Sequence, residues 1–158
     1  MKEMGFILAL AATVTPLSAQ QAPRVVGSLP PAELAALETI RTNVWVNWFS
    51  GDTAALHRVL GPELVAISPD APQYQSLEET LAGSARFKAN GGSFVSVHFD
   101  SSLVHRFGDV VVMFSHYKVV MAHQGKESAQ SGRATEVFVR HKGKWVHTSW
   151  HLDVTEGQ

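Results

Sequence analysis

The 158-residue sequence contains no cysteine, which excludes disulfide bonds, thiolate nucleophiles and cysteine metal sites. Charged residues are also scarce: they make up 17% of the chain, with 13 basic and 14 acidic side chains and no block of one sign. Nucleic acid and anionic membrane surfaces require a concentrated basic face, so neither is an expected partner. The sequence also lacks a phosphate-binding glycine loop, a nucleophile elbow, a zinc-binding helix motif and an EF-hand loop. We accordingly predict no metal ion and no cofactor.

The first residues have the layout of a secretory signal. A short polar start precedes an apolar run from Gly5 to Val14, which Ser18 and Ala19 follow as small residues before a cut. The run is shorter than the roughly 20 apolar residues that span a bilayer. We predict cleavage after Ala19, giving a periplasmic or secreted protein without membrane attachment; a buried N-terminal helix is the alternative. The predicted divisions are a signal peptide at 1–19, a lead-in segment at 20–30 and one domain at 31–155.

The first half of the mature chain has the periodicity of helices. In the first predicted helix, apolar residues recur at steps of three and four, which favours one buried helix face: Leu34, Leu37, Ile40, Val44 and Trp48. Asp52 is placed to cap a second helix, and Ser76 with Glu79 forms a capping box for a third. The predicted elements are helices at 31–50, 52–60 and 76–88 and a brief strand at 64–68.

From residue 93 onward the apolar period changes to two, which is typical of strands. Helices followed by a meander of long antiparallel strands predict an α+β fold, with the helices packed on one face of the sheet. The predicted strands lie at 94–106, 110–123, 132–141 and 145–154, with turns at 107–109 and 142–144 and a longer loop at 124–131.

Three stretches resemble one superfamily. Residues 47–52 (Asn-Trp-Phe-Ser-Gly-Asp) and residues 108–109 (Gly-Asp) are similar to parts of nuclear transport factor 2-like and SnoaL-like domains. Residues 135–145, followed by Ser-Trp-His at 149–151, resemble the last hairpin of the association domain of calcium/calmodulin-dependent protein kinase II. The resemblance covers residues 31–155.

This resemblance implies a cone-shaped, curved antiparallel sheet wrapped around N-terminal helices, a pocket inside the cone and a homodimer. The same scaffold serves isomerases, cyclases, hydrolases, dehydratases and oligomerisation modules, so the fold does not fix the function. The arginine-lined pocket of the kinase association domain corresponds here to Lys118, Glu136 and Leu152, of which only Lys118 is positive.

Glu136 is the candidate catalytic carboxylate. If Glu136, His116 and Lys118 face the interior of the cone, Glu136 is placed as a general base, and His116 or Lys118 stabilises a developing oxyanion. The alternative is structural: Glu136 and Lys118 form a cross-strand ion pair. The predicted ligand-binding residues are those expected to line the pocket or close its mouth: Lys118, Trp150, Phe138, Thr148 and Tyr74.

Strict alternation along the last strand assigns four polar residues to the face opposite Trp150. Alternate positions on one strand stand far apart and supply no complete ligand set, so metal binding is a minor alternative to a dimer interface or a solvated surface. These residues are His147, Ser149, His151 and Asp153.

The leading hypothesis is an exported homodimer that binds a small, largely apolar ligand in the cone. Two alternatives stay open at this point. One is a cofactor-free isomerase, cyclase or dehydratase that uses Glu136; the other is an oligomerisation hub. Whether the protein is an enzyme is not decided by its sequence.

Overall fold

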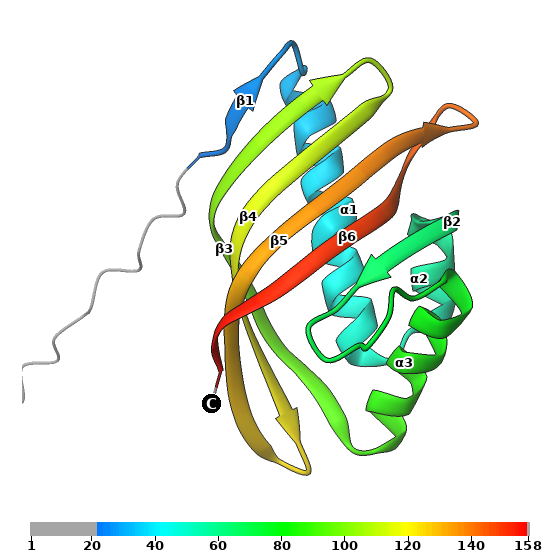
Figure 1. Cartoon of the computed structure of the whole chain (residues 1–158), viewed down its shortest axis with the longest axis vertical. Coiled ribbons are helices and arrows are strands. Elements are labelled where there is room, and N and C mark those ends of the chain that lie inside the picture. The colour runs from blue at the N-terminus through cyan, green and yellow to red at the C-terminus, as the bar shows by residue number, and fades with distance from the viewer. Residues whose placement is uncertain (1–21, 158) are drawn as a thin grey trace, which may run out of the picture.

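The computed structural model describes residues 22–157, so the predicted signal peptide at 1–19 lies outside the described residues. Within that range helices come first and long strands follow, as the change of period predicts (Figure 1). The helices are α1 (Pro31–Ser50), α2 (Thr53–Val59) and α3 (Leu77–Ala89). The strands are β1 (Arg24–Val26), β2 (Leu60–Ile67), β3 (Gly92–Phe107), β4 (Val110–His123), β5 (Lys126–His141) and β6 (Lys144–Gly157).

α1 is the long helix that packs against the sheet. Proline at its start suits a first turn, where the missing N–H has no helical partner. Gly51 ends it with a φ of 74°, a left-handed conformation that glycine adopts without a steric penalty. Its buried residues are Leu37, Arg41, Val44 and Trp45, which share one helix face. The predicted stripe is therefore confirmed at Leu37 and Val44, but it also contains a buried arginine.

Both predicted helix caps are present. The Asp52 carboxylate accepts a hydrogen bond from the backbone N–H of Ala55 at 2.8 Å at the start of α2. At the start of α3, the Ser76 hydroxyl accepts from the Glu79 backbone and the Glu79 carboxylate accepts from the Ser76 backbone. Such caps contribute about 1 kcal/mol each, and here they fix where α2 and α3 begin.

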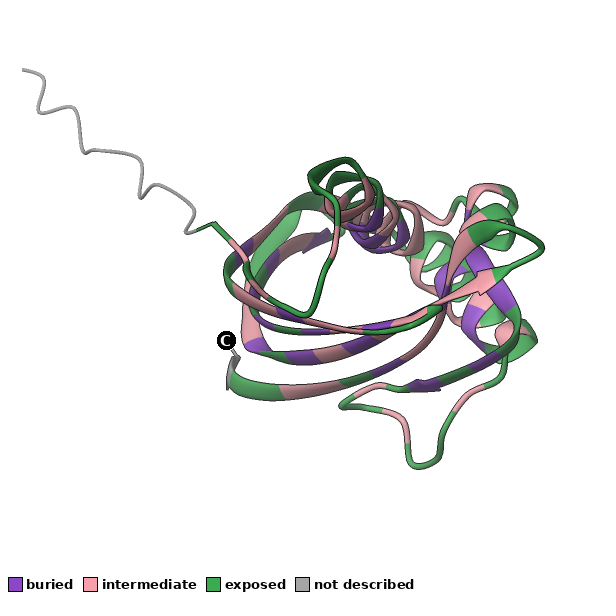
Figure 2. Cartoon of the chain, turned by 90° about the horizontal axis from the view of Figure 1, so that it is seen from above, coloured by how far each residue is buried: buried purple, intermediate pink, exposed green. Residues whose placement is uncertain are grey.

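The sheet has the strand order β1-β3-β4-β5-β6-β2 over the described chain. β3 to β6 form an antiparallel meander, and β1 and β2 add in parallel at its two edges. The sheet curves, and its concave face is turned toward α1 (Figure 2).

Three local predictions differ from the structure. The segment expected to be only a lead-in contains β1, and the strand expected at 64–68 begins earlier, at Leu60. The predicted loop at 124–131 is mostly strand, because Gln124 and Gly125, with φ values of 51° and 80°, turn the chain tightly into β5. Positive φ at both central residues matches the right-handed twist of a hairpin.

A β-bulge interrupts the pairing of β5 with β6. Val137 lies opposite Ser149 while the next residue, Phe138, lies opposite His147, so Thr148 is an additional residue in β6. One additional residue reverses which side chains face each side of the sheet. Before the bulge His147 faces the helices, and after it Trp150 does.

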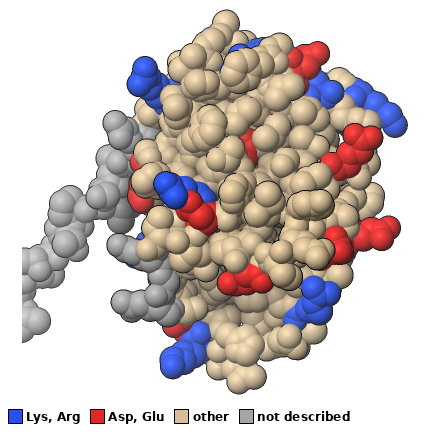
Figure 3. Space-filling model, in the orientation of Figure 1, with Lys and Arg blue, Asp and Glu red and all other residues tan. Residues whose placement is uncertain are grey.

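The hydrophobic core lies between the concave face and the helices, in clusters around Leu37 and Phe138, around Trp45 and Tyr117, and around Leu56 and Trp150. Full burial of one such side chain contributes about 1.5–3 kcal/mol. On the face seen in Figure 3, basic and acidic side chains are scattered between larger uncharged areas, as the balanced composition predicts. Between residues 22 and 157, no helix has the length and apolar character needed to cross a membrane.

Candidate functional site

A cavity of about 660 Å³ lies between the sheet, α1, α3 and the loop at residues 68–75. Small-molecule sites measure roughly 300–1,000 Å³. Two backbone hydrogen bonds between Ala66 and Gln75, at 2.7 and 2.9 Å, hold the loop against β2. The aromatic side chains that line the cavity are Trp45, Trp48, Phe49, Tyr74, Phe87 and Trp150. The cavity is therefore suited by size and lining to a flat apolar molecule.

A buried carboxyl group and a buried imidazole lie side by side in the lining of this cavity. Glu136 is 0% exposed and His147 is 1% exposed. The Nε2 atom of His147 lies 3.8 Å from Oε1 of Glu136, and Nε1 of Trp45 donates a hydrogen bond to the same oxygen at 3.3 Å. Within residues 22–157, Oε2 of Glu136 and both ring nitrogens of His147 have no hydrogen-bond partner.

Burial shifts the two titrating groups in opposite directions. It raises the pKa of Glu136 to about 7, against the smaller lowering effects of the Arg41 charge and the Trp45 hydrogen bond. It lowers the pKa of His147 to about 3, so this imidazole is neutral at physiological pH. A carboxyl group that gains or loses a proton near pH 7, beside a neutral imidazole, has the properties required of an acid–base site.

Arg41 places a positive charge behind this pair. Its side chain is 1% exposed, and its Nη1 donates to the hydroxyls of Ser115 at 2.8 Å and Ser102 at 3.0 Å. The guanidinium carbon lies 3.9 Å from the centre of the Phe99 ring. Burial lowers the pKa of Arg41 and the Glu136 charge raises it. Because arginine keeps its proton in proteins, Arg41 supplies a fixed cation that favours the ionised form of Glu136.

The expectation that His116 and Lys118 face the pocket is wrong. Along β4 the alternate residues Ser115 and Tyr117 are buried, whereas His116 and Lys118 are exposed on the outer face. Lys118 pairs in register with Ser131 of β5, so the alternative of a cross-strand ion pair with Glu136 is wrong too. Period-two alternation was correct here, but it did not tell which face of the strand is inner.

The predicted ligand-binding residues divide between lining and packing positions. Trp150 and Tyr74 line the cavity, with Tyr74 73% exposed in the loop at 68–75. Phe138 is buried in the core instead and stacks on His147 at a ring distance of 4.4 Å. Thr148 is the bulge residue and lies beside Gly61 of β2. The bulge and the depth of Phe138 explain why these two do not form the predicted wall.

His147 is the site residue that alternation assigned to the wrong face. A signal for its true position exists in the sequence: Trp145 and Trp150 are both large aromatic residues, yet they are five apart and so fall on opposite faces of a regular strand. Trp145 packs on the Leu37 cluster and Trp150 on the Leu56 cluster, both on the inner side. Two inward tryptophans at odd spacing require an additional residue between them.

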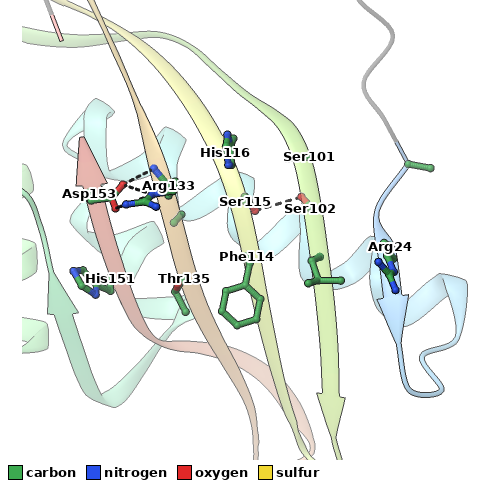
Figure 4. Close-up of a pocket in the computed structure, with 13 residues that line it drawn as sticks. Arg24, Ser101, Ser102, Phe114, Ser115, His116, Arg133, Thr135, His151 and Asp153 are labelled. Carbon is green, nitrogen blue, oxygen red and sulfur yellow. Dashed lines mark hydrogen bonds and ion pairs between the residues drawn. The ribbon is translucent and has the colours of Figure 1, made fainter. Parts of the chain in front are cut away.

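The outer face of the sheet carries a second, more polar groove of about 530 Å³ (Figure 4). His116, Arg133, His151 and Asp153 line it, and Nε of Arg133 donates to Oδ2 of Asp153 at 2.9 Å. Hydrogen bonds from Arg133 hold the pKa of Asp153 below its ordinary value. Arg133 and Asp153 hydrogen-bond to each other, and the His116 and His151 side chains are exposed to solvent. In the part of the chain that the structure describes, no three His, Asp or Glu residues are grouped to hold a metal ion.

A curved sheet closed on one side by helices, with an aromatic cavity between them, defines the class of cone-shaped α+β pocket proteins. The chain belongs to the SnoaL-like domain family, whose profile matches residues 42–155. The predicted resemblance to this superfamily is confirmed. Among curated proteins none matches the chain.

Solved structures with the same fold include three from bacteria. A suggested Ca/calmodulin-dependent kinase II association domain from Exiguobacterium sibiricum has a TM-score of 0.68 at 14% identity, covering 84% of this chain and 100% of that one. A suggested dehydratase of the nuclear transport factor 2-like family from Streptomyces avermitilis has a TM-score of 0.67 at 18% identity, covering 80% and 99%. A nuclear transport factor 2-like protein from Cytophaga hutchinsonii has a TM-score of 0.65 at 13% identity, covering 77% and 98%. At these identities the likeness shows the fold alone.

Proposed function

We propose that the protein binds a small, largely apolar molecule in the cavity between the sheet and the helices. The observation that carries this proposal is the cavity itself, about 660 Å³ in volume with six aromatic side chains in its lining. Aromatic rings offer large, rigid contact areas to a flat ligand. The buried polar groups at Glu136 and His147 give such a ligand a defined orientation.

The first test is native mass spectrometry of gently purified protein, followed by thermal unfolding with 2-methylnaphthalene as an apolar probe. We expect a retained ligand mass or a rise in melting temperature with the probe. A Cβ atom at Gly83 would lie 3.7 Å from the Trp48 ring, so Gly83→Leu fills the cavity from α3. We expect it to abolish the effect, while Ala82→Leu, exposed on the same helix, keeps it. A wild-type protein with neither bound mass nor probe response would refute the proposal.

Proton transfer at Glu136 is the second candidate function, in the manner of a cofactor-free isomerase, cyclase or dehydratase. The pKa of about 7 and the neighbouring His147 favour it, and one relative of the same fold is a suggested dehydratase. The test follows deuterium exchange at the acidic C–H positions of the ketone 2-tetralone by NMR. Catalysed exchange in the wild type and background exchange in Glu136→Gln would support the role. Equal rates in both would exclude it.

A homodimer formed through the outer sheet face is the proposed assembly. This face presents half-buried valines and the 41% exposed Phe114, an apolar area that a second copy would cover. Sedimentation velocity of the mature chain should give a dimer, and Phe114→Glu should give a monomer. A large ring of subunits would instead favour the hub alternative.

Export to the periplasm or the medium completes the proposal and is supported by the signal-like pattern at residues 1–19. Expression of the full chain in a bacterial host should yield a periplasmic protein that begins at Gln20, as measured by intact mass. A cytoplasmic product that still carries its first residue would contradict export.

A further inference from the structure

Three neighbouring side chains of the cavity lining carry buried polar atoms that find no hydrogen-bond partner in the described chain: Oε2 of Glu136, both nitrogens of His147, and Nε1 of Trp150. Glu136 and Trp150 are paired directly across β5 and β6, and the rings of His147 and Trp150 lie 5.3 Å apart. Each buried polar group without a partner destabilises the folded chain by about 1–3 kcal/mol. Such a cluster in a cavity lining indicates a polar group that a ligand supplies.

The chemistry of these atoms restricts that group. The indole of Trp150 only donates a hydrogen bond, while Oε2 of an ionised Glu136 only accepts one. A neutral His147 donates from one nitrogen and accepts at the other. A matching group must therefore accept from the indole and donate to the carboxylate or the imidazole.

Three other kinds of head group satisfy only part of this set. An ether or ketone oxygen only accepts. An ammonium only donates, so it cannot accept the hydrogen bond from the Trp150 indole. A carboxylate would bring a second negative charge close to Glu136. A hydroxyl has one donor and two lone pairs, so it satisfies both requirements with no charge.

Resting on the proposed function, we infer that the ligand is a hydroxylated ring compound whose hydroxyl group reaches Glu136, His147 and Trp150, while its apolar body lies among the aromatic walls. The unpartnered atoms are covered by their neighbours, so the hydroxyl reaches them when the flanking side chains rotate. In the bound state, the ligand hydroxyl then forms hydrogen bonds with the polar atoms of Glu136, His147 and Trp150 that have no partner in the described chain.

The test uses three probes with the same ring system in isothermal titration calorimetry of the mature protein. They are 2-naphthol, which donates and accepts, 2-methoxynaphthalene, which only accepts, and 2-methylnaphthalene, which does neither. We expect 2-naphthol to bind at least about tenfold more tightly than either of the others, since one net hydrogen bond corresponds to roughly that factor.

Matched variants test two of the three side chains, Trp150 and His147. Trp150→Phe keeps a ring and removes the N–H, and His147→Phe keeps a ring against Phe138. Each should reduce the ratio of 2-naphthol affinity to 2-methylnaphthalene affinity by about tenfold, because a loss of apolar contact affects both probes and cancels in the ratio. Trp145→Phe is the control, because its indole N–H is also buried without a partner among residues 22–157 but lies outside the cavity lining. It should keep the full preference. Two variants are used so that a folding defect in one does not decide the result.

The possible failures separate the two proposals. Equal affinity for all three probes overturns the hydroxyl inference and leaves apolar binding in place. A preference for 2-naphthol that survives in both Trp150→Phe and His147→Phe also overturns it, because the recognition then arises elsewhere. Absence of binding by every probe, with no ligand retained in mass spectrometry, refutes the inference and the proposed function together.

Discussion

The two faces of the same curved sheet hold similar charged residues in opposite physical states. On the inner side, burial is almost complete for Glu136 and His147 of the sheet and for Arg41 of α1, and it is the largest cause of each pKa shift. On the outer face, Arg133 and Asp153 form an exposed pair whose pKa shifts come from their mutual hydrogen bonds. A carboxylate in water near an arginine becomes a stronger acid, whereas a carboxylate taken out of water becomes a weaker one.

Residue type alone therefore does not identify a functional site in this chain. The sequence named His116 as a residue that would stabilise an oxyanion beside Glu136 if it faced the cone interior, but His116 is exposed on the outer face. The inner face supplies Glu136 with a histidine partner that the strand pattern had assigned outside. The burial of the side chains, more than their residue types, distinguishes the candidate site from the surface of this chain.

The largest expected contrast compares Arg41 of α1, buried against the inner face, with Arg133 on the outer face. Arg41→Met should lower the free energy of unfolding by about 3 kcal/mol, because two hydrogen bonds from a charged donor to Ser102 and Ser115 are lost in the interior. Arg133→Met should change it little, since this exposed pair is screened by solvent. Urea unfolding at pH 7, followed by tryptophan fluorescence, measures both. Equal losses in the two variants would contradict the contrast.

The second contrast is the pH dependence of stability. The folded-state pKa of Glu136, about 7, exceeds the ordinary 4.5, so its stabilisation is complete below pH 4.5 and is lost as the pH rises toward 7. The folded-state pKa of His147, about 3, is below the ordinary 6.5, so its stabilisation is complete above pH 6.5 and is lost as the pH falls toward 3. Between pH 4.5 and 6.5 the two effects oppose each other in the wild type.

Single substitutions should reveal the pH-dependent contributions of Glu136 and His147 separately. Relative to the wild type, the stability of Glu136→Gln should rise with pH over this window by up to roughly 1 kcal/mol per pH unit, and that of His147→Phe should fall by a similar amount. Urea unfolding at half-unit pH steps gives the slopes. Glu127→Gln, on the exposed start of β5, is the control and should follow the wild type. Parallel curves for all four proteins would show that the buried pair does not titrate as described.

The smallest expected effect is on the outer strand face. His116→Ala and Lys118→Ala should leave the affinity for 2-methylnaphthalene within about twofold of the wild type, because both side chains are exposed on the side of β4 away from the cavity. Trp48→Ala, which removes part of the cavity lining, should weaken binding strongly. Calorimetric titration of the three variants provides the comparison. Loss of binding in Lys118→Ala would contradict the assignment of faces.

Much of the fold was predictable because its signals are local. The caps at Asp52 and Ser76, the period-four stripe of α1 and the turns at Gly108 and Gly143 each depend on a few neighbouring residues. The edge strands were harder. β1 is three residues long and depends on pairing with β3, so its own sequence carries little information.

The candidate site was predictable only in part. Glu136 and Trp150 were placed correctly with respect to each other, since they are paired across regular strands. The contribution of Arg41 from α1 was not predicted. In the sequence alone, an arginine next to an apolar stripe looks like a surface residue until its two serine partners on β3 and β4 are known. His147 required knowledge of the bulge, which is a property of two paired strands and not of one.

The additional residue Thr148 reverses the alternation of inward and outward side chains along β6. Upstream of it, the odd-numbered side chains of β6 face the helices; downstream, the even-numbered ones do, and the backbone ladder continues on both sides. Deletion of Thr148 would leave a regular strand in which Trp145, His147 and Trp150 occupy alternate positions and all face the helices. Loss of the bulge with Thr148 retained would instead turn His147 toward solvent. The inward position of His147 therefore depends on the backbone geometry at Thr148, which the identity of the site residues does not reveal.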